Sequence, residues 1–248
     1  MLSDHEVAAQ VATRAGALLL ALRATDRAGE LMSLGDEGDA SAHDLIVAAL
    51  AELRPGDKVL SEEGAEDRTR LGASRCWIVD PLDGTREFGE PGRTDWAVHV
   101  ALVDGVGAPI AGAVAVPAAG VTLTTEPAPS PPPHHDGPLR VIVSRTRPPA
   151  VALQVADALG GELVTMGSAG AKAMAVVLGH ADVYAHAGGQ YEWDSCAPVA
   201  VALAAGLHAS RIDGRPLVYN RPDPWLPDLL ICRPELANRC LQAIAATA

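Results

Sequence analysis

The sequence is short of aromatic residues, of lysine and of long hydrophobic runs. Phe, Trp and Tyr make up only 3% of its 248 residues, so alanine and valine must fill most of any core. Lys58 and Lys172 are its only lysines, a bias that we attribute to a GC-rich genome before any function. Apolar residues still make up 48% of the chain. With 248 residues, the chain is long enough to bury a substantial core, as one large or two small domains.

Basic residues are outnumbered as well. The chain carries 19 Lys and Arg against 31 Asp and Glu, which gives a formal charge of -12. Binding to a nucleic acid polymer needs a basic face, so we expect no such partner. The same balance permits a small phosphorylated substrate, because a bound Mg²⁺ reverses the sign of the local charge.

No feature predicts a membrane span or an oxidising compartment. Residues 98–116 form the longest apolar stretch, but Asp104, Pro109 and several glycines divide it into a hairpin. The N-terminus has Asp4 and Glu6 where a signal peptide has a basic region. The 4 cysteines show no CxxC spacing and are expected to be reduced core thiols. We therefore expect a cytoplasmic protein without a membrane partner.

Helical and extended patterns alternate along the chain, which predicts the α/β class. Apolar residues at helical spacing and capping signals predict helices at about 4–24, 41–54, 150–159, from 167 onward, at 195–205 and from 234 onward. Short apolar or alternating runs predict strands at 58–60, 76–80, 96–103, 110–116, 139–143, 162–165, 181–185 and 229–232. Residues 29–39 and 190–194 are predicted as loops.

The strongest composition break lies at residues 126–138. This stretch contains six prolines and almost nothing that could pack, and it predicts a linker or a loose loop. We therefore divide the chain into an N-terminal α+β domain (1–126), the proline-rich segment (127–138) and a C-terminal α/β domain (139–248). The adjacent His134 and His135 are interpreted as part of a polar linker in preference to an adventitious metal site.

A turn near residue 80 carries the clearest chemical signal. Asp80 follows three apolar residues of a predicted strand, and Asp83, Gly84 and Thr85 come directly behind Pro81. Carboxylates bind hard divalent cations, and free backbone amides bind phosphate oxygens. The alternative is that both acids cap the turn and the next helix, which explains one carboxylate well and both poorly. The turn thus predicts metal-assisted chemistry on a phosphate ester.

Further acids stand at the ends of other predicted elements. Glu62 and Glu63 follow a short apolar strand, and Asp194 stands at a predicted helix start, where an N-cap is the alternative role. Carboxylates this close together repel one another unless a metal ion neutralises them. Ser168 and Lys172 lie near another helix start, a favourable place for an anion, although Lys172 taken alone is more simply explained as solvent-facing.

These motifs together resemble those of a known family. Ser-Glu-Glu at 61–63, Trp-Ile-Val-Asp-Pro-Leu-Asp-Gly-Thr at 77–85 and Trp-Asp-Ser at 193–195 are similar to the three signatures of the inositol monophosphatase superfamily, whose members are Mg²⁺-dependent, lithium-sensitive phosphatases. The order and spacing agree over nearly the whole chain. Arg-Glu-Phe at 86–88 and the segments 143–145 and 188–210 resemble the CysQ-type 3'(2'),5'-bisphosphate nucleotidase branch, especially its actinobacterial members.

The resemblance implies a role for each matching residue. The implied Mg²⁺ ligands, for two or three ions, are Glu62, Asp80, Asp83, Asp194 and the Leu82 carbonyl. Thr85 and Asp39 would orient the attacking water, although Asp36 stands where the family usually has a Thr three residues before that acid. The implied substrate-binding residues are Asp83, Gly84, Thr85, Ser144, Arg145, Ser168, Lys172, Gln190 and Glu192.

The resemblance also implies an activity and a fold. The expected reaction is direct hydrolysis of the 3'-phosphate of 3'-phosphoadenosine 5'-phosphate, and also of the 3'-phosphate of 3'-phosphoadenosine 5'-phosphosulfate. This activity would link the protein to sulfate assimilation. The expected fold alternates helix and sheet layers, with an antiparallel N-terminal sheet, and family members often form homodimers. One alternative is another substrate for the same fold, an inositol phosphate or fructose 1,6-bisphosphate. A second is a haloacid-dehalogenase-type phosphatase, but the acids of that family lie two residues apart and those of this chain lie three apart. A third is a non-catalytic module that senses a phosphate or nucleotide.

Overall fold

Two five-stranded sheets form the framework of the protein in a computed structural model that describes residues 2–25 and 31–246, without the side chains of 31–33. The first sheet consists of β1 (Lys58–Ser61), β2 (Arg75–Asp83), β3 (Ala97–Asp104), β4 (Pro109–Val116) and β5 (Val121–Thr124). Its strands lie in sequence order, and all neighbours are antiparallel except β1 and β2. The predicted antiparallel character of the N-terminal sheet therefore holds for three of its four strand pairs.

The second sheet is mixed. It consists of β6 (Arg140–Ser144), β7 (Glu162–Met166), β8 (Val183–Tyr191), β9 (His208–Ser210) and β10 (Trp225–Cys232). The order is β7-β6-β8-β10-β9, with β6 parallel to both of its neighbours and β10 antiparallel to both of its own. The parallel pairs are joined through helices, as crossover connections require.

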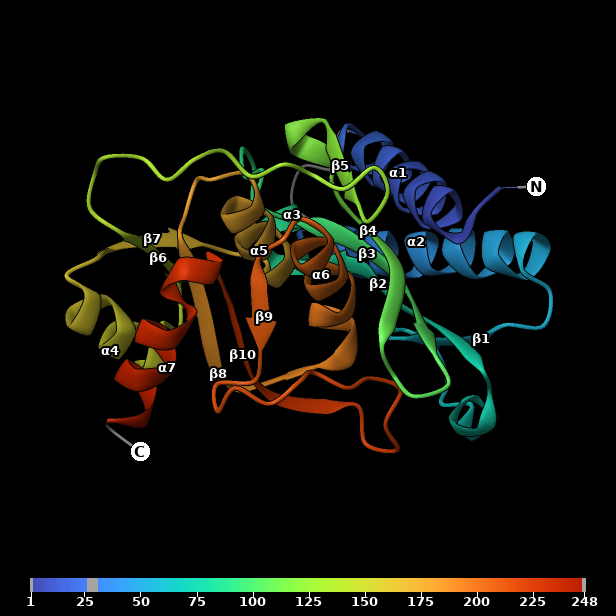
Figure 1. The fold of residues 1–248 in the computed structure, drawn as a ribbon. Helices are drawn as coiled ribbons and strands as arrows, with labels where there is room; N and C mark the ends of the chain where they lie inside the picture. Colours follow the sequence, from blue (N-terminus) through green and yellow to red (C-terminus); the bar gives the residue numbers. More distant parts are fainter. Residues whose placement is uncertain (1, 26–30, 247–248) are drawn as a thin grey trace.

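The helices form three layers around these sheets. The longer helices are α1 (Asp4–Arg23), α2 (Leu31–Leu53), α4 (Ala150–Leu159), α5 (Ala169–Val177), α6 (Glu192–Ala204) and α7 (Ala237–Ala245). The short ones are α3 (Thr85–Gly89), η1 (Arg68–Gly72), η2 (Pro117–Ala119) and η3 (Pro234–Leu236). Figure 1 shows α1 and α2 on one side, α4 and α7 on the other, and α5 and α6 between the two sheets. The predicted sandwich of alternating layers is confirmed.

Three hydrophobic clusters match these layers. One fills the space between α1, α2 and the first sheet, a second lies around α5 and α6 between the sheets, and a third packs α4 and α7 on the second sheet. The four cysteines are free and buried, as expected. None of the helices in the described part of the chain combines the length and apolar character that a membrane crossing needs.

The predicted loop at 29–39 is wrong for residues 31–39, while residues 29 and 30 lie outside the described residues. Residues 31–39 form the first turns of α2. Gly38 stands where the helix packs closely, since a Cβ there would lie 3.0 Å from Phe88 and 3.1 Å from Leu82. The glycines that suggested a loop thus permit close packing of α2 on the turn after β2.

Two other boundaries differ from the prediction. Residues 190–194 are not a loop, because β8 continues to Tyr191 and α6 begins at Glu192. Pairing of β10 with β8 extends the strand through Gly188 and Gly189, although both have positive φ. Pro81 does not end β2, since the strand continues to Asp83 with a register shift after Asp80.

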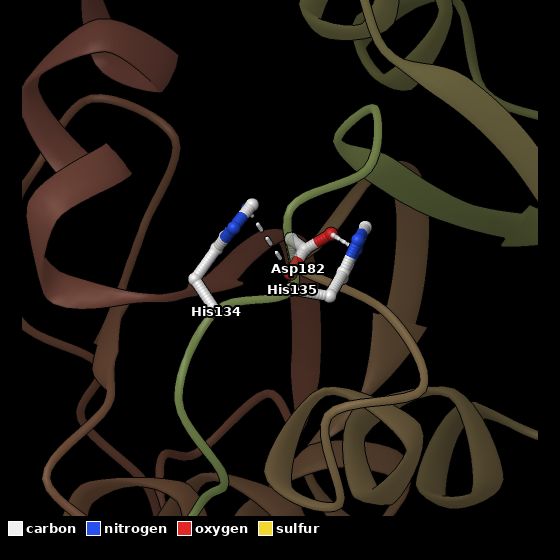
Figure 2. Close-up of side chains that lie close together, drawn as sticks. All are labelled: His134, His135 and Asp182. Atoms are coloured by element: carbon white, nitrogen blue, oxygen red, sulfur yellow. Dashed lines mark hydrogen bonds and ion pairs between the residues drawn. The ribbon is translucent and has the colours of Figure 1, made fainter.

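The proline-rich segment 127–138 has no helix or strand and crosses the surface from the first sheet to the second (Figure 1). It is nevertheless tied down, because His134 and His135 flank the buried Asp182 at 3.7 and 3.3 Å (Figure 2). Arg233 and Arg140 also contact this carboxylate, at 3.1 and 3.5 Å. With two guanidinium groups already present, the cluster holds the segment in place and is a poor site for a cation. The division into domains at this segment stays a prediction.

Candidate active site

A cleft of about 410 Å³ lies between the end of β2, the start of α5, the end of β8 and the start of β10. Most of the predicted site residues contribute to its walls. Those that line it are Asp83, Gly84, Thr85, Ser144, Ser168, Lys172, Gln190 and Asp194.

Three carboxylates meet beside this cleft. Asp80 and Asp83 come from the end of β2, and Asp194 comes from the first turn of α6. Each offers an oxygen that lies within 4.8 Å of the others. The strand end and the helix start thus bring together acids that are far apart in the sequence.

The surroundings of Asp80 show whether this group of carboxylates fits a cation. Its side chain is buried, Oδ1 accepts a hydrogen bond from the Leu82 backbone N–H at 3.1 Å, and Oδ2 has no hydrogen-bond partner among the described residues. Burial and the neighbouring Asp83 and Glu62 raise its pKa well above the ordinary value. The nearest basic group of the described residues is His99 Nδ1, at 3.9 Å from Oδ2. A buried carboxylate oxygen without a hydrogen bond, among other hard oxygen ligands, fits a divalent cation such as Mg²⁺.

Asp83 is held by the N-terminus of α5. Its oxygens accept hydrogen bonds from the Ser168 hydroxyl at 2.5 Å and from the backbone N–H groups of Ala169 and Gly170 at 3.1 and 2.5 Å. Burial alone would raise the pKa of Asp83, but hydrogen bonds from His99 and Ser168 lower it to about 2. Asp83 therefore stays ionised and fixes the start of α5 against the turn.

Asp194 and Glu62 complete the acidic surroundings. Asp194 Oδ2 accepts the Tyr191 backbone N–H at 2.6 Å, which leaves its other oxygen for the cluster. Burial and Asp83 raise the pKa of Asp194 to about 6. Glu62, on the turn after β1, lies outside the group of three carboxylates and does not line the cleft. Loss of water around its carboxyl group and the nearby Asp194 raise its pKa to about 7.

Thr85 and Asp39 form the predicted pair. Thr85 Oγ1 lies 3.1 Å from Asp39 Oδ2 and 3.2 Å from the Leu82 carbonyl oxygen. Asp39 is buried on α2, and its Oδ1 has no hydrogen-bond partner in the described part of the chain. Burial is the main cause that raises its pKa to about 7. Such a carboxyl group can take up a proton near neutral pH.

Lys172 is buried and does not point to solvent. Its Nζ donates to the carbonyls of Gly167 and Ser168, the second at 2.8 Å, and lies 5.4 Å from the centre of the Tyr184 ring. Burial lowers its pKa. The ammonium group thus supports the loop before α5 and adds positive charge at the floor of the cleft.

Two predicted substrate residues are not brought into the cleft. The guanidinium of Arg145 contacts Glu87, at 2.7 Å, and Glu90. Glu192 is buried and accepts the backbone N–H groups of Asn220 and Arg221 at 2.6 and 2.9 Å. Neither side chain lines the cavity.

Sequence reasoning missed His99, which lies behind the cleft, and several residues that line it. His99 is buried on β3, donates from Nδ1 to the Trp193 carbonyl at 3.0 Å and places Nε2 3.2 Å from Asp83. A polar residue within an otherwise apolar strand was the one signal for it. Arg86, Arg147, Tyr191 and Trp225 line the cleft. Arg86 and Tyr191 lie in segments that resemble the family, but no local motif marks Arg147 or Trp225.

This layered fold, with acids gathered beside an anion-binding helix start, is that of the inositol monophosphatase family, and the chain belongs to that family. The family model matches residues 3–128 and 137–246, which confirms the resemblance. The chain is 53% identical to the 3'-phosphoadenosine 5'-phosphate phosphatase of Mycobacterium tuberculosis (strain CDC 1551 / Oshkosh), over 93% of this chain and 89% of the relative. It is 50% identical to the protein of the same name from Mycobacterium leprae (strain TN), over 98% and 94%.

More distant relatives have the same family and fold. The chain is 30% identical to the 3'(2'),5'-bisphosphate nucleotidase CysQ of Escherichia coli (strain K12), over 88% of this chain and 94% of that protein. The crystal structure of CysQ from Bacteroides thetaiotaomicron superposes with a TM-score of 0.80 at 28% identity, covering 93% and 97%. Inositol monophosphatase II from Staphylococcus aureus MSSA476 shares the fold, with a TM-score of 0.78 at 19% identity, covering 96% and 95%.

Proposed function

We propose that the protein is a Mg²⁺-dependent phosphatase that removes the 3'-phosphate of 3'-phosphoadenosine 5'-phosphate and also acts on 3'-phosphoadenosine 5'-phosphosulfate. The observation that carries the proposal is the cluster of Asp80, Asp83 and Asp194 near the Thr85–Asp39 pair, beside a cleft that Asp83, Thr85 and Asp194 line. The names of the relatives at 50–53% identity support the choice of substrate.

The cluster supplies ligands for the metal. Asp80, Asp83, Asp194, Glu62 and the Leu82 carbonyl would hold two or three Mg²⁺ ions. When bound, these ions neutralise phosphate charge, lower the pKa of a water molecule and stabilise the leaving oxygen. Asp80 Oδ2, which accepts no hydrogen bond from a described residue, supports this assignment.

Thr85 and Asp39 would direct the water. The Thr85 hydroxyl donates to Asp39 and accepts from the attacking water, so a proton passes from the water to Thr85 and from Thr85 to Asp39. The raised pKa of Asp39 suits it to receive that proton. The backbone N–H groups of Gly84 and Thr85, at the start of α3, would hold the phosphate from the other side.

Positive charge at the rim would hold the second phosphate of the substrate. Arg86 and Arg147 are exposed, line the cleft and make no hydrogen bond or ion pair through their side chains with another described residue. An unpaired guanidinium is a strong ligand for phosphate. A bisphosphate uses this charge and an inositol monophosphate does not. Ser144, Ser168, Lys172 and Gln190 would contact the rest of the substrate.

Comparison of three substrates tests the proposal. We expect kcat/KM at equal Mg²⁺ to be highest for 3'-phosphoadenosine 5'-phosphate, followed by fructose 1,6-bisphosphate and inositol 1-phosphate. A preference for either of the latter two would contradict the substrate assignment but preserve the metal chemistry. Binding of the nucleotide without Mg²⁺-dependent phosphate release would identify a sensing module. A homodimer, a cytoplasmic location and a link to sulfate assimilation stay predictions.

A further inference from the structure

Two of the few aromatic side chains lie exposed at the wall of the cleft formed by the second sheet. Tyr191 and Trp225 are 44% and 43% exposed, and both line the cavity. Five of the other six aromatic residues are at most 2% exposed: Trp77, Phe88, Trp96, Tyr184 and Tyr219. A chain that buries its scarce aromatic residues elsewhere therefore exposes two of them at its functional cleft.

The two rings are fixed relative to each other. Tyr191 ends β8 and lies opposite Trp225, which begins β10. Their ring centroids are 5.6 Å apart at an interplanar angle of 80°, and Tyr191 stacks on Trp193 at 4.8 Å and 9°. The rings thus form a supported corner, whose apolar faces are held in place before any ligand arrives.

Gly189 sets the position of the Trp225 ring. A Cβ at this residue would lie 1.6 Å from Cη2 of Trp225, and φ is +90°. The indole therefore rests directly on the backbone of β8, where a side chain would displace it. This contact keeps the indole at the cleft.

A buried amide belongs to Gln190, the residue before Tyr191 on β8. Gln190 is 8% exposed, lines the cavity, and its Nε2 has no hydrogen-bond partner among the described residues. A buried amide donor without a partner is costly unless a ligand or a water accepts its hydrogen bond. Flat apolar faces and a free donor that line the same cavity match a heterocyclic base, which has π faces and acceptor atoms at its edge.

We propose that Tyr191 and Trp225 form a nucleobase platform in which the purine of the substrate stacks on one ring and turns its edge to the other, while Gln190 donates a hydrogen bond to the base. The inference rests on the proposed function and adds the part of the cleft that selects a nucleoside bisphosphate over other phosphate esters. Arg86 and Arg147, on the same cleft, then face the phosphates of that nucleotide.

Substrates with and without a base test the platform. For Trp225→Ala and Tyr191→Ala, we expect KM for 3'-phosphoadenosine 5'-phosphate to rise about 10-fold or more, with kcat little changed, because the base loses its stacking partner. Ribose 3,5-bisphosphate, which has no base, should show no such change. Trp225→Phe should retain most of the affinity. Leu203→Ala, at an exposed residue of α6 outside the cleft, should behave as the unchanged protein.

Binding without turnover separates this inference from the proposed function. Calorimetry in Mg²⁺ should show adenosine 5'-phosphate binding at least 10-fold tighter than ribose 5-phosphate, and Trp225→Ala should remove that difference. Equal binding of both ligands to the unchanged protein, or equal losses for both substrates in the variants, overturns the platform. Failure to hydrolyse 3'-phosphoadenosine 5'-phosphate overturns the proposed function, while the pair of binding measurements still decides the platform.

Discussion

At the scale of single residues, the Thr85 hydroxyl has one proton and two acceptors, Asp39 and the Leu82 carbonyl. We expect Thr85→Val and Asp39→Asn each to lower kcat about 100-fold with KM little changed, because each removes the proton path from water. The double variant should be no slower than the worse single variant, since the two groups act together.

Thr146→Val is the matched control for this prediction, because Thr146 also lines the cleft and lies outside the pair. Steady-state kinetics at constant Mg²⁺ measures all four variants. Losses that multiply in the double variant would show that Thr85 and Asp39 act independently.

The second residue-scale prediction concerns Arg147. Replacement by Ala should lower kcat/KM for 3'-phosphoadenosine 5'-phosphate about 10-fold, because a charge-assisted contact to its 5'-phosphate is lost. Adenosine 3'-phosphate, which has no 5'-phosphate, should be hydrolysed at an unchanged rate. Arg215→Ala removes an exposed arginine outside the cleft and serves as the control. Equal losses on both substrates would place Arg147 in a general electrostatic role.

Residues with a local signal could be predicted, and those placed by tertiary contacts could not. Asp80 and Asp83 follow an apolar strand and precede a glycine, so their clustering was readable from the sequence. His99 contacts Asp83 only because β3 pairs with β2. Arg145 is captured by Glu87 and Glu90, a contact that no local pattern indicates.

At the scale of elements, Asp182 connects the proline-rich segment with the second sheet. It precedes β8 and accepts hydrogen bonds from the Arg140 backbone N–H at 2.8 Å and from Arg233 at 3.1 Å. Burial alone would raise the pKa of Asp182, but these hydrogen bonds, with one from His135, lower it. We expect Asp182→Asn to reduce the free energy of unfolding at pH 7 by about 3 kcal/mol, because two guanidinium groups lose their buried partner.

The pH dependence of this effect follows from the lowered pKa. The stabilisation is fully present above the unfolded pKa of about 3.9 and is lost as pH falls through the lower folded value. Urea denaturation of both proteins should give a smaller difference near pH 3 than at pH 5, a range in which protonation of His134 and His135 does not interfere. Asp136→Asn, an exposed acid in the same segment, is the control. A difference that stayed the same between pH 5 and pH 3 would contradict the assignment to Asp182.

Element boundaries show the same division between local and tertiary causes. α1 and α4 match the predicted ranges, because their caps and apolar spacing lie within the element. The first turns of α2 contain glycines that serve packing, and the end of β8 depends on pairing with β10. Trp225 follows Pro-Asp-Pro, a typical turn sequence, so only that pairing places it at the cleft.

At the scale of the whole molecule, the carboxyl groups of Asp80, Asp83 and Asp194 destabilise the fold when they are ionised together, and a bound cation reduces this effect. We expect Mg²⁺ at millimolar concentration to raise Tm by several degrees, because binding to the folded state alone stabilises it. Asp80→Asn should raise Tm of the metal-free protein by a few degrees, since it replaces a buried carboxyl group whose ionisation is opposed by burial and by neighbouring acids, and should abolish the Mg²⁺-dependent shift and activity.

Differential scanning calorimetry in EDTA and in Mg²⁺ measures both effects. NaCl at equal ionic strength should shift Tm less than Mg²⁺ does, and the exposed Glu235→Gln should keep the shift of the unchanged protein. If Asp80→Asn retained the full Mg²⁺-dependent shift, the cluster would not be the metal site.

The placement of α6 in the central layer has a consequence for synthesis of the chain. Asp80 and Asp83 leave the ribosome early, on the first sheet, while Asp194 arrives with α6, after most of the second sheet has been made. α6 packs against β2, β3 and β4, so the face of the first sheet that it covers stays bare until then. A nascent chain therefore has neither a finished core nor the complete cluster of Asp80, Asp83 and Asp194 before residue 194 has emerged. On the proposed function, hydrolysis begins only once the fold is nearly complete.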